Sequence, residues 1–187
     1  MSVRVHIPTP MRQHTQGQAV VEVGGGTVQE LALSYPDRVR SLILGCTTAK
    51  DKAISPAVVT LFRLLPLSLL GRLRGNRLYG TRPIDPDLVR EDQEVIAAMK
   101  VWPDGRRAQT LSLAPFTTTD RLGRLRVPTL VIHGTADRAV AYAAGVRLAG
   151  LIQGAKLVTL EGSGHAYTTD AAEEANQAVL DFLAGVP

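Results

Sequence analysis

The sequence is poor in cysteine and in aromatic residues. Its 187 residues include a single cysteine, and Phe, Trp and Tyr together make up 4%. One cysteine excludes an internal disulfide framework and fits a reducing compartment, so we expect a cytoplasmic protein. With so few aromatic side chains, the core has to be built mainly from Leu, Val, Ile and Ala.

Long apolar runs are also missing. Residues 1–18 contain no apolar stretch of the length that a secretory signal needs. The longest apolar region, residues 53–70, is interrupted by Arg63 and Pro66. These interruptions exclude a membrane span there. Residues 62–77 are basic and apolar enough to lie on anionic lipid, but a helix with solvated arginines is the simpler interpretation.

The charge balance is basic without the pattern of a nucleic-acid surface. The formal net charge is +4 and the sequence pI is about 9.6. The arginines are spread along the chain, and no aromatic residues alternate with them to stack on bases. We therefore expect no nucleic-acid partner.

The apolar pattern predicts strands that alternate with helices. We expect strands at residues 19–23, 39–44, 127–133 and 156–160, and helices at residues 27–34 and 141–152. Asp170, with Glu173 three residues later, has the spacing of a capping box and predicts the start of a last helix. Such alternation is typical of the α/β class, with a mainly parallel sheet flanked by helices.

Two segments depart from this alternation. Residues 1–18 are polar and without a clear period, so we expect an irregular lead before a domain at residues 19–187. Residues 47–119 have an all-helical pattern, in which Pro66 separates two apolar pieces and Asp85 precedes a third. We expect this insertion to form a helical lid over a pocket.

Two candidate catalytic side chains follow neighbouring strands. Asp137 comes after the strand at 127–133, and His165 comes after the strand at 156–160. The carboxyl ends of parallel strands share one edge of a sheet, where a carboxylate can orient an imidazole and stabilise its protonated form. The spacing alone leaves a simpler alternative open, in which Asp137 caps a helix and His165 is a polar loop residue. His133 lies inside an apolar strand and is expected to be a core residue.

Three segments carry a resemblance to a known family. Residues 29–44 read QELALSYPDRVRSLIL, residues 127–140 read VPTLVIHGTADRAV, and residues 162–165 read GSGH. In order and spacing they resemble the C-terminal portion of the α/β-hydrolase fold of esterases, lipases and lactonases. The resemblance implies that Asp137 is the acid and His165 the general base of a catalytic triad. It also implies hydrolysis of a small apolar ester or lactone, without a metal or an organic cofactor.

The nucleophile of that triad is not evident. The family carries it in a G-x-S-x-G turn between a strand and a helix. Alignment without gaps places Glu22 at the serine position, where a strand-end residue is a simpler interpretation than a carboxylate nucleophile. Cys46 ends a strand where a thiol could face the site, but it comes one strand too late, and a buried structural cysteine is the simpler interpretation. Six candidate serines all lie outside such a motif: Ser34, Ser41, Ser55, Ser68, Ser112 and Ser163.

The resemblance therefore covers only the second half of the fold. It implies that the last four strands are present and that residues 19–23 lie at an edge of the sheet, where a neighbouring strand would pair. We expect weak or absent hydrolysis and self-association through that edge. The alternative is a non-catalytic binding or partner protein that keeps the fold. The substrate is not fixed, because pocket residues would come from the lid.

Overall fold

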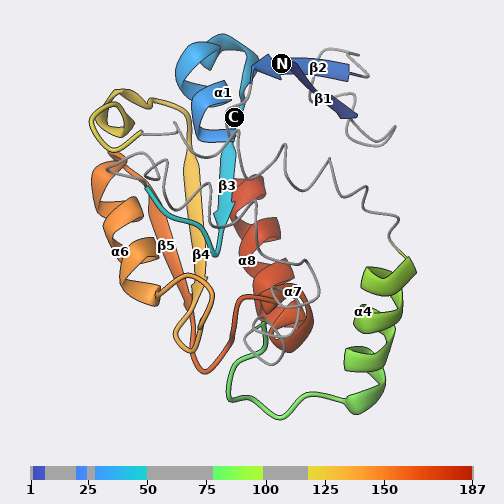
Figure 1. Ribbon diagram of the computed structural model, residues 1–187. Coiled ribbons are helices and arrows are strands. Elements are labelled where there is room, and N and C mark those ends of the chain that lie inside the picture. The colour runs from blue at the N-terminus through green and yellow to red at the C-terminus, as the bar shows by residue number, and fades with distance from the viewer. Residues whose placement is uncertain (1, 7–19, 25–27, 50–77, 99–117, 187) are drawn as a thin grey trace, which may run out of the picture.

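A parallel sheet forms the centre of the computed structural model. The structure describes residues 2–6, 20–24, 28–49, 78–98 and 118–186. The sheet has the order β3 (Leu42–Gly45), β4 (Thr129–Gly134) and β5 (Lys156–Leu160). Both pairings are parallel, so the carboxyl ends of the three strands lie at the same edge (Figure 1).

The central strand β4 is covered on both faces. All of its residues are buried. Leu130 and Ile132 belong to one hydrophobic cluster, while Val131 between them belongs to the other. An apolar run of this kind fits a strand of a parallel sheet that has helices on both sides.

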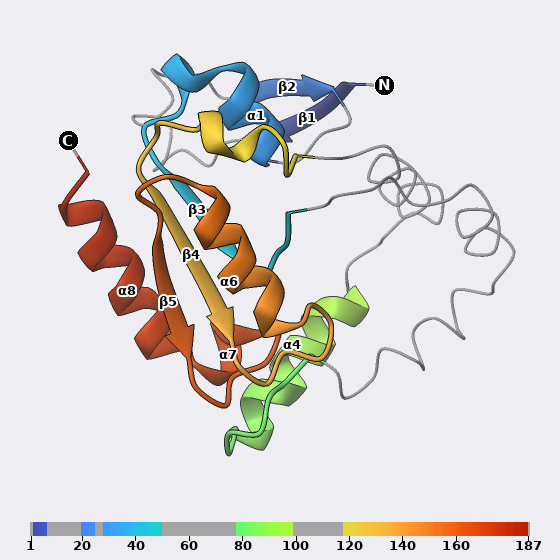
Figure 2. The same cartoon turned by 90° about the vertical axis from the view of Figure 1, so that its left-hand side faces the viewer.

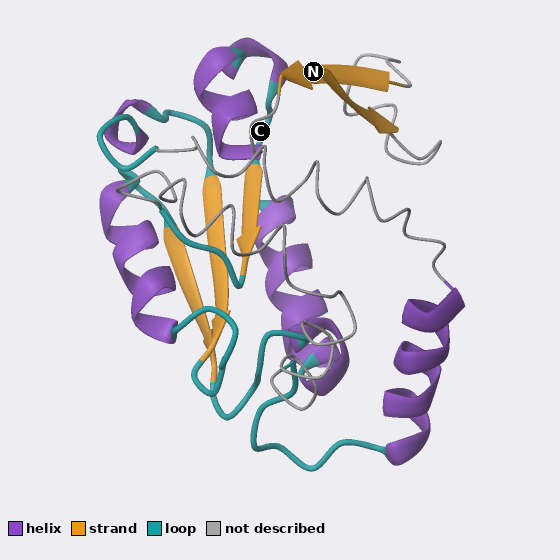
Figure 3. Ribbon diagram, viewed as in Figure 1, coloured by secondary structure: helices purple, strands orange, loops and turns teal. Residues whose placement is uncertain are grey.

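Helices α6 (Tyr142–Leu151) and α1 (Val28–Ser34) pack on the first face of the sheet. Leu148 of α6 and Ala32 of α1 are fully buried in the same cluster as Val131. Figure 2 shows α6 and α8 on opposite faces of the sheet. Figure 3 shows how helices and strands alternate along the chain. The predicted α/β class is confirmed.

Helix α8 (Ala172–Ala184) packs on the second face, after the short helix α7 (Tyr167–Asp170). Ala175 and Phe182 of α8 are buried against Leu130 of the central strand. The last helix thereby covers the side of the sheet that α6 leaves open.

Helix α1 ends where the sequence predicts, because Pro36 begins a 3-10 turn (Pro36–Arg38) directly after it. In this helix the apolar Val28 is 55% exposed, whereas the polar Gln29 is buried. The Gln29 amide donates to the carbonyl of Thr48 and accepts from the hydroxyl of Thr118, which satisfies the polar group inside the protein.

The N-terminal residues form a separate sheet. Strand β1 (Ser2–His6) pairs antiparallel with β2 (Val20–Gly24). This corrects two expectations: residues 2–6 are a strand and not irregular, and residues 19–23 do not supply an edge strand of the parallel sheet. Strand β1 pairs with the backbone groups along one edge of β2. In the described part of the chain, β3 is therefore an edge of the parallel sheet, and self-association through a sheet edge stays a prediction.

Part of the predicted insertion is described. Helix α4 (Pro86–Ala98) begins where the sequence predicts, and the Asp85 carboxylate accepts a hydrogen bond from the N–H of Asp87. The two apolar pieces at residues 58–65 and 67–73 lie outside the described residues, so the lid stays a prediction. Within the described ranges, no helix has the length and apolar character needed to cross a membrane.

Candidate active site

Asp137 lies in the turn that follows β4. Its Oδ1 atom accepts hydrogen bonds from the N–H groups of Ala139, at 2.7 Å, and Val140, at 2.8 Å. A short aspartate side chain can close such a turn onto its own backbone. The turn holds the carboxylate in place, so that Oδ2 faces His165.

His165 lies in the loop that follows β5. Gly162 in this loop has a φ of +70°, which glycine adopts without steric cost. The loop also approaches the end of β4 closely, because a Cβ at Gly134 would overlap the backbone of Ser163. Glycine at these two positions lets the loop bring His165 to the edge of the sheet.

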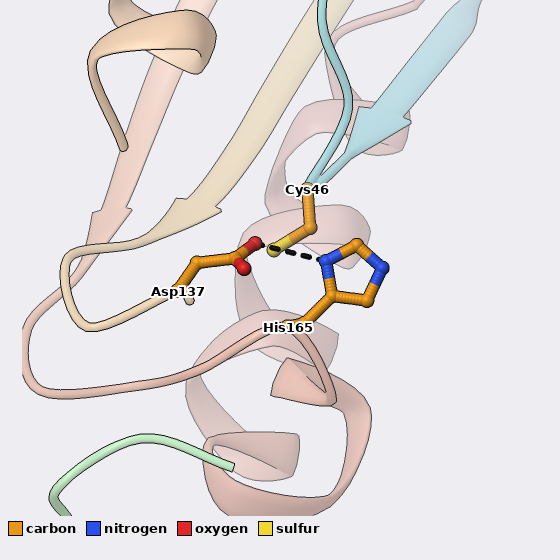
Figure 4. A group of neighbouring side chains, drawn as sticks. All are labelled: Cys46, Asp137 and His165. Carbon is orange, nitrogen blue, oxygen red and sulfur yellow. Dashed lines mark hydrogen bonds and ion pairs between the residues drawn. The ribbon is translucent and has the colours of Figure 1, made fainter. Parts of the chain in front are cut away.

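The two predicted side chains meet. His165 Nδ1 lies 2.9 Å from Asp137 Oδ2, and Figure 4 shows the imidazole and the carboxylate facing each other. The Asp137 side chain is completely buried, whereas the His165 side chain is 35% exposed. Because the carboxylate accepts from Nδ1, the other ring nitrogen, Nε2, keeps a lone pair that can take a proton.

The environment of Asp137 keeps its carboxylate ionised. Burial raises the pKa of Asp137, but hydrogen bonds from Val140, His165 and Ala139 outweigh this effect. The net result is a pKa below the ordinary value. The negative charge is therefore available to stabilise a protonated His165.

His133 is confirmed as a core residue. Its ring is fully buried, and Nε2 donates to the carbonyl of Val140 at 3.0 Å. The ring packs against α6, where a Cβ at Gly145 would overlap it. Among the described side chains, none bonds to the Nδ1 of His133. His133 Nε2 also lies 3.4 Å from Asp137 Oδ2, so this core residue borders the site.

Cys46 also lies at this edge of the sheet. It follows β3 directly, its N–H donates to the carbonyl of Ile132, and its φ is +44°. The thiol is buried and lies 3.6 Å from the carbonyl oxygen of Gly164. Burial raises the pKa of Cys46 to about 12, which keeps the thiol protonated at neutral pH. A protonated, buried thiol is a poor nucleophile.

Asp170 corrects another expectation. The capping-box spacing predicts that it caps the last helix, but the residue before α8 is Ala171, which makes no side-chain capping bond. The Asp170 carboxylate accepts instead from the Ser163 hydroxyl, from Gly164 N–H at 2.7 Å and from Gly80 N–H at 2.9 Å. These three donors lie around the His165 loop, so Asp170 anchors that loop.

The sequence offers no local signal for this role of Asp170. Its carboxylate accepts hydrogen bonds from Ser163, which is fully buried, and from Gly80, which lies 90 residues away in the chain. The capping-box spacing considers only residues at the start of one helix, so it cannot detect partners elsewhere in the fold. The contribution of Asp170 therefore emerges only from the fold.

Apart from Cys46, the candidate nucleophiles in the described part of the chain do not lie beside the pair. Glu22 belongs to β2, which lies at the end of the molecule opposite α7 and the loops at the carboxyl ends of the strands (Figures 1 and 2). Ser34 donates to Glu30, and Ser163 donates to Asp170. Ser55, Ser68 and Ser112 lie outside the described residues.

Comparisons with other proteins show what the chain as a whole resembles. Residues 22–172 match the family model of serine aminopeptidases of the S33 type. The 2-hydroxy-6-oxononadienedioate/2-hydroxy-6-oxononatrienedioate hydrolase of Klebsiella pneumoniae is 28% identical over 173 residues, which are 87% of this chain and 60% of that protein. The 2-hydroxymuconate semialdehyde hydrolase of Pseudomonas putida is 32% identical over 171 residues, with coverage of 86% and 59%.

A solved structure has a similar fold. The enol-lactonase from Burkholderia xenovorans LB400 superposes with a TM-score of 0.68 at 25% sequence identity. The match covers 86% of this chain and 62% of the lactonase. The chain thus spans about three fifths of the length of these relatives.

Proposed function

This chain belongs to the α/β-hydrolase family, and on that premise we propose that Asp137 and His165 are the acid–base pair of a site that hydrolyses a small carboxylic ester or lactone. The observation that carries the proposal is the 2.9 Å hydrogen bond between a buried carboxylate and a partly exposed imidazole. The pair lies at the carboxyl ends of parallel strands, where open α/β sheets bind their ligands.

The proposed chemistry uses His165 twice. Nε2 takes a proton from the attacking oxygen while that oxygen adds to the substrate carbonyl, and the Asp137 carboxylate stabilises the resulting imidazolium. When the tetrahedral intermediate collapses, the same nitrogen returns the proton to the leaving oxygen. The net change is ester plus water to acid plus alcohol.

The attacking oxygen in this chain is proposed to come from water. Glu22, at the expected serine position, lies in β2 at the far end of the molecule, and the hydroxyls of Ser34 and Ser163 donate elsewhere. General-base catalysis without a positioned nucleophile contributes a factor of roughly 10² to 10⁴ over the uncatalysed rate. We therefore expect slow hydrolysis.

The relatives support hydrolysis at the level of the family. By their names, two of them hydrolyse 2-hydroxy-6-oxo dienedioates or a 2-hydroxymuconate semialdehyde, and the solved structure is that of an enol-lactonase. These substrates belong to those proteins. For this chain, the proposal is limited to a small carbonyl substrate that reaches the exposed side of His165.

The insertion at residues 47–119 is proposed to act as the lid of this site. Its described part is bound close to the histidine loop, since the Asp92 carboxylate of α4 accepts from the hydroxyl of Thr169 in α7 at 2.6 Å and from that of Tyr79. The backbone carbonyl of Leu78 accepts from the N–H of Ala166, next to His165. These contacts tie the insertion to the loop that a lid would cover.

An ester assay tests the function. The chain, His165→Ala and Asp137→Asn are compared for p-nitrophenyl acetate hydrolysis, with His6→Ala in the distant strand β1 as the histidine control. We expect at least a tenfold loss in the two site variants and wild-type turnover in the control. Turnover that is indifferent to both site changes would refute the proposed site.

A second candidate function is binding without turnover, and the position of Glu22 favours it. A protein that keeps the fold but has no nucleophile at the site can still hold a small carbonyl compound beside His165. This alternative predicts that wild-type protein hydrolyses no faster than His165→Ala, while calorimetry detects binding of a non-hydrolysable ester analogue to wild-type protein only.

A further inference from the structure

The carboxyl ends of the parallel strands bring a thiol, a carboxylate and an imidazole together. Each of Cys46, Asp137 and His165 offers one donor atom, and these atoms all lie within 4.8 Å of one another. Figure 4 shows that the side chains converge from β3, from the turn after β4 and from the loop after β5. We propose that this trio, called here the thiol site, binds a zinc ion.

The donor set suits Zn²⁺ better than other common cations. Zinc binds thiolate sulfur, imidazole nitrogen and carboxylate oxygen at about 2.0 to 2.3 Å, which places two donors of one ion roughly 3.5 Å apart. The Asp137 and His165 donors are already 2.9 Å apart, so small side-chain movements are enough. A thiol ligand disfavours Ca²⁺ and Mg²⁺, which take oxygen ligands.

Burial and charge also fit a zinc ion. Cys46 and Asp137 are 4% and 7% exposed, and His165 gives the ion access from solvent. On binding, the Cys46 thiol releases its proton to solvent and its sulfur bonds to the ion, without any change of oxidation state. A thiolate and a carboxylate together neutralise the two positive charges of the ion, so no net charge is buried.

The surroundings hold the ligands in place. Asp137 Oδ1 is engaged by two backbone N–H groups, which leaves Oδ2 to turn toward the ion. Asp170 anchors the loop that carries His165. Such support from groups around the ligands is what orients a metal site.

Zinc at the thiol site excludes the acid–base pair. The Asp137 Oδ2 and His165 Nδ1 atoms that would bind the ion are the two atoms that now share a hydrogen bond. A bound ion separates them and removes the negative charge that stabilises the imidazolium. The same side chains therefore have two exclusive states, a hydrogen-bonded pair and a zinc site. This departs from the expectation, taken from the family resemblance, that no metal is involved.

Cobalt spectroscopy tests the thiol site without any substrate. Cys46 is the only cysteine of the chain, so a thiolate-to-cobalt absorption band can come from no other residue. We expect wild-type protein to show this band with Co²⁺ and to lose it when Zn²⁺ displaces the cobalt. Absence of the band at saturating Co²⁺ would overturn the proposal.

Zinc affinity in variants provides the second measurement. Competition with a chromogenic chelator should show at least a tenfold weaker affinity in Cys46→Ser, Asp137→Asn and His165→Gln. The double variant His6→Gln, His14→Gln removes two of the three histidines other than His165 and should bind as wild type. Unchanged affinity in Cys46→Ser, or loss of binding in the double variant, would contradict the proposal.

Alkylation of the wild-type protein guards against variants that fail to fold. The reaction of Cys46 with iodoacetamide is followed in urea at the unfolding midpoint, where the unfolded fraction exposes the thiol; zinc that binds the folded site should slow it, and equal rates with and without zinc would count against the thiol site. None of these measurements uses hydrolysis. The zinc site and the proposed function can therefore fail separately.

Discussion

The two ends of the molecule are built on different principles. At the carboxyl edge of the parallel sheet, residues far apart in the chain meet: His165 bonds to Asp137, and Asp170 bonds to Gly80. At the opposite end, β1 pairs with the nearby β2, which carries Glu22 (Figure 1). The described residues therefore bring the proposed acid–base pair together at one edge of the sheet. Among the same described residues, Glu22 lies at the other end of the molecule from this pair.

The close approach between the end of β4 and the His165 loop gives the largest expected effect. Gly134→Ala adds a Cβ that overlaps the backbone of Ser163, so the His165 loop has to move away from β4. We expect the free energy of unfolding, measured by urea denaturation, to fall by about 3 kcal/mol. Gly150→Ala in α6 is the matched control, because its Cβ would meet no atom within 4 Å. Equal stability of the two variants would show that β4 and the His165 loop are not in contact at Gly134.

The anchor of the His165 loop comes second. Asp170→Ala leaves the donors of Ser163 and Gly164 without their acceptor, which should cost about 2 kcal/mol in unfolding free energy. Hydrolysis should fall as well, because His165 is less well positioned. Asp181→Asn, on the exposed side of α8, serves as the control and should change neither quantity. An Asp170→Ala protein with wild-type stability would contradict the anchoring role.

An ion pair between α1 and the segment before β4 should have a small, pH-dependent effect. Hydrogen bonds from Arg121 hold the pKa of Glu30 below its usual range. The pair therefore stabilises the protein above the ordinary glutamate pKa of about 4.3, and this contribution is lost as the pH falls through the lower pKa of the folded state.

The two side chains of this ion pair are about 30% exposed, so the contribution is on the order of 0.5 kcal/mol. Glu30→Gln should lower the unfolding free energy at pH 7 by this amount and leave it nearly unchanged at pH 3. The exposed Glu173→Gln is the control. If the difference in unfolding free energy between wild type and Glu30→Gln grew toward low pH, that would contradict the stabilising ion pair.

A substitution in β2 should not change hydrolysis. Glu22→Ser places a hydroxyl at the position of the family's nucleophile, but β2 lies at the other end of the molecule from His165. We expect unchanged ester hydrolysis and no labelling by a fluorophosphonate probe. Labelling that appears with Glu22→Ser and disappears when His165→Ala is added would show that β2 reaches the site.

The sequence predicts those features that depend on local pattern. Apolar runs identify the three strands of the parallel sheet, and Pro36 marks the end of α1. Positions after strand ends identify Asp137 and His165, because parallel strands present their carboxyl ends at one edge.

Features that depend on distant partners escape the sequence pattern. Residues 2–6 are too few to show a clear period, and their pairing with residues 20–24 emerges only from the fold. Cys46 comes one strand later in the sequence than the family's nucleophile. The strand order β3-β4-β5 nevertheless brings it beside Asp137. Asp170 has the spacing of a helix cap, although buried loop donors take its carboxylate.

A double-mutant cycle tests the central claim that Asp137 acts through His165. Steady-state hydrolysis of p-nitrophenyl acetate is measured for wild type, Asp137→Asn, His165→Ala and the double variant, all at the same pH with a chelator present. If the two residues work as a unit, the double variant is no slower than His165→Ala alone. Losses that multiply in the double variant would show that the two side chains act independently and would contradict the account.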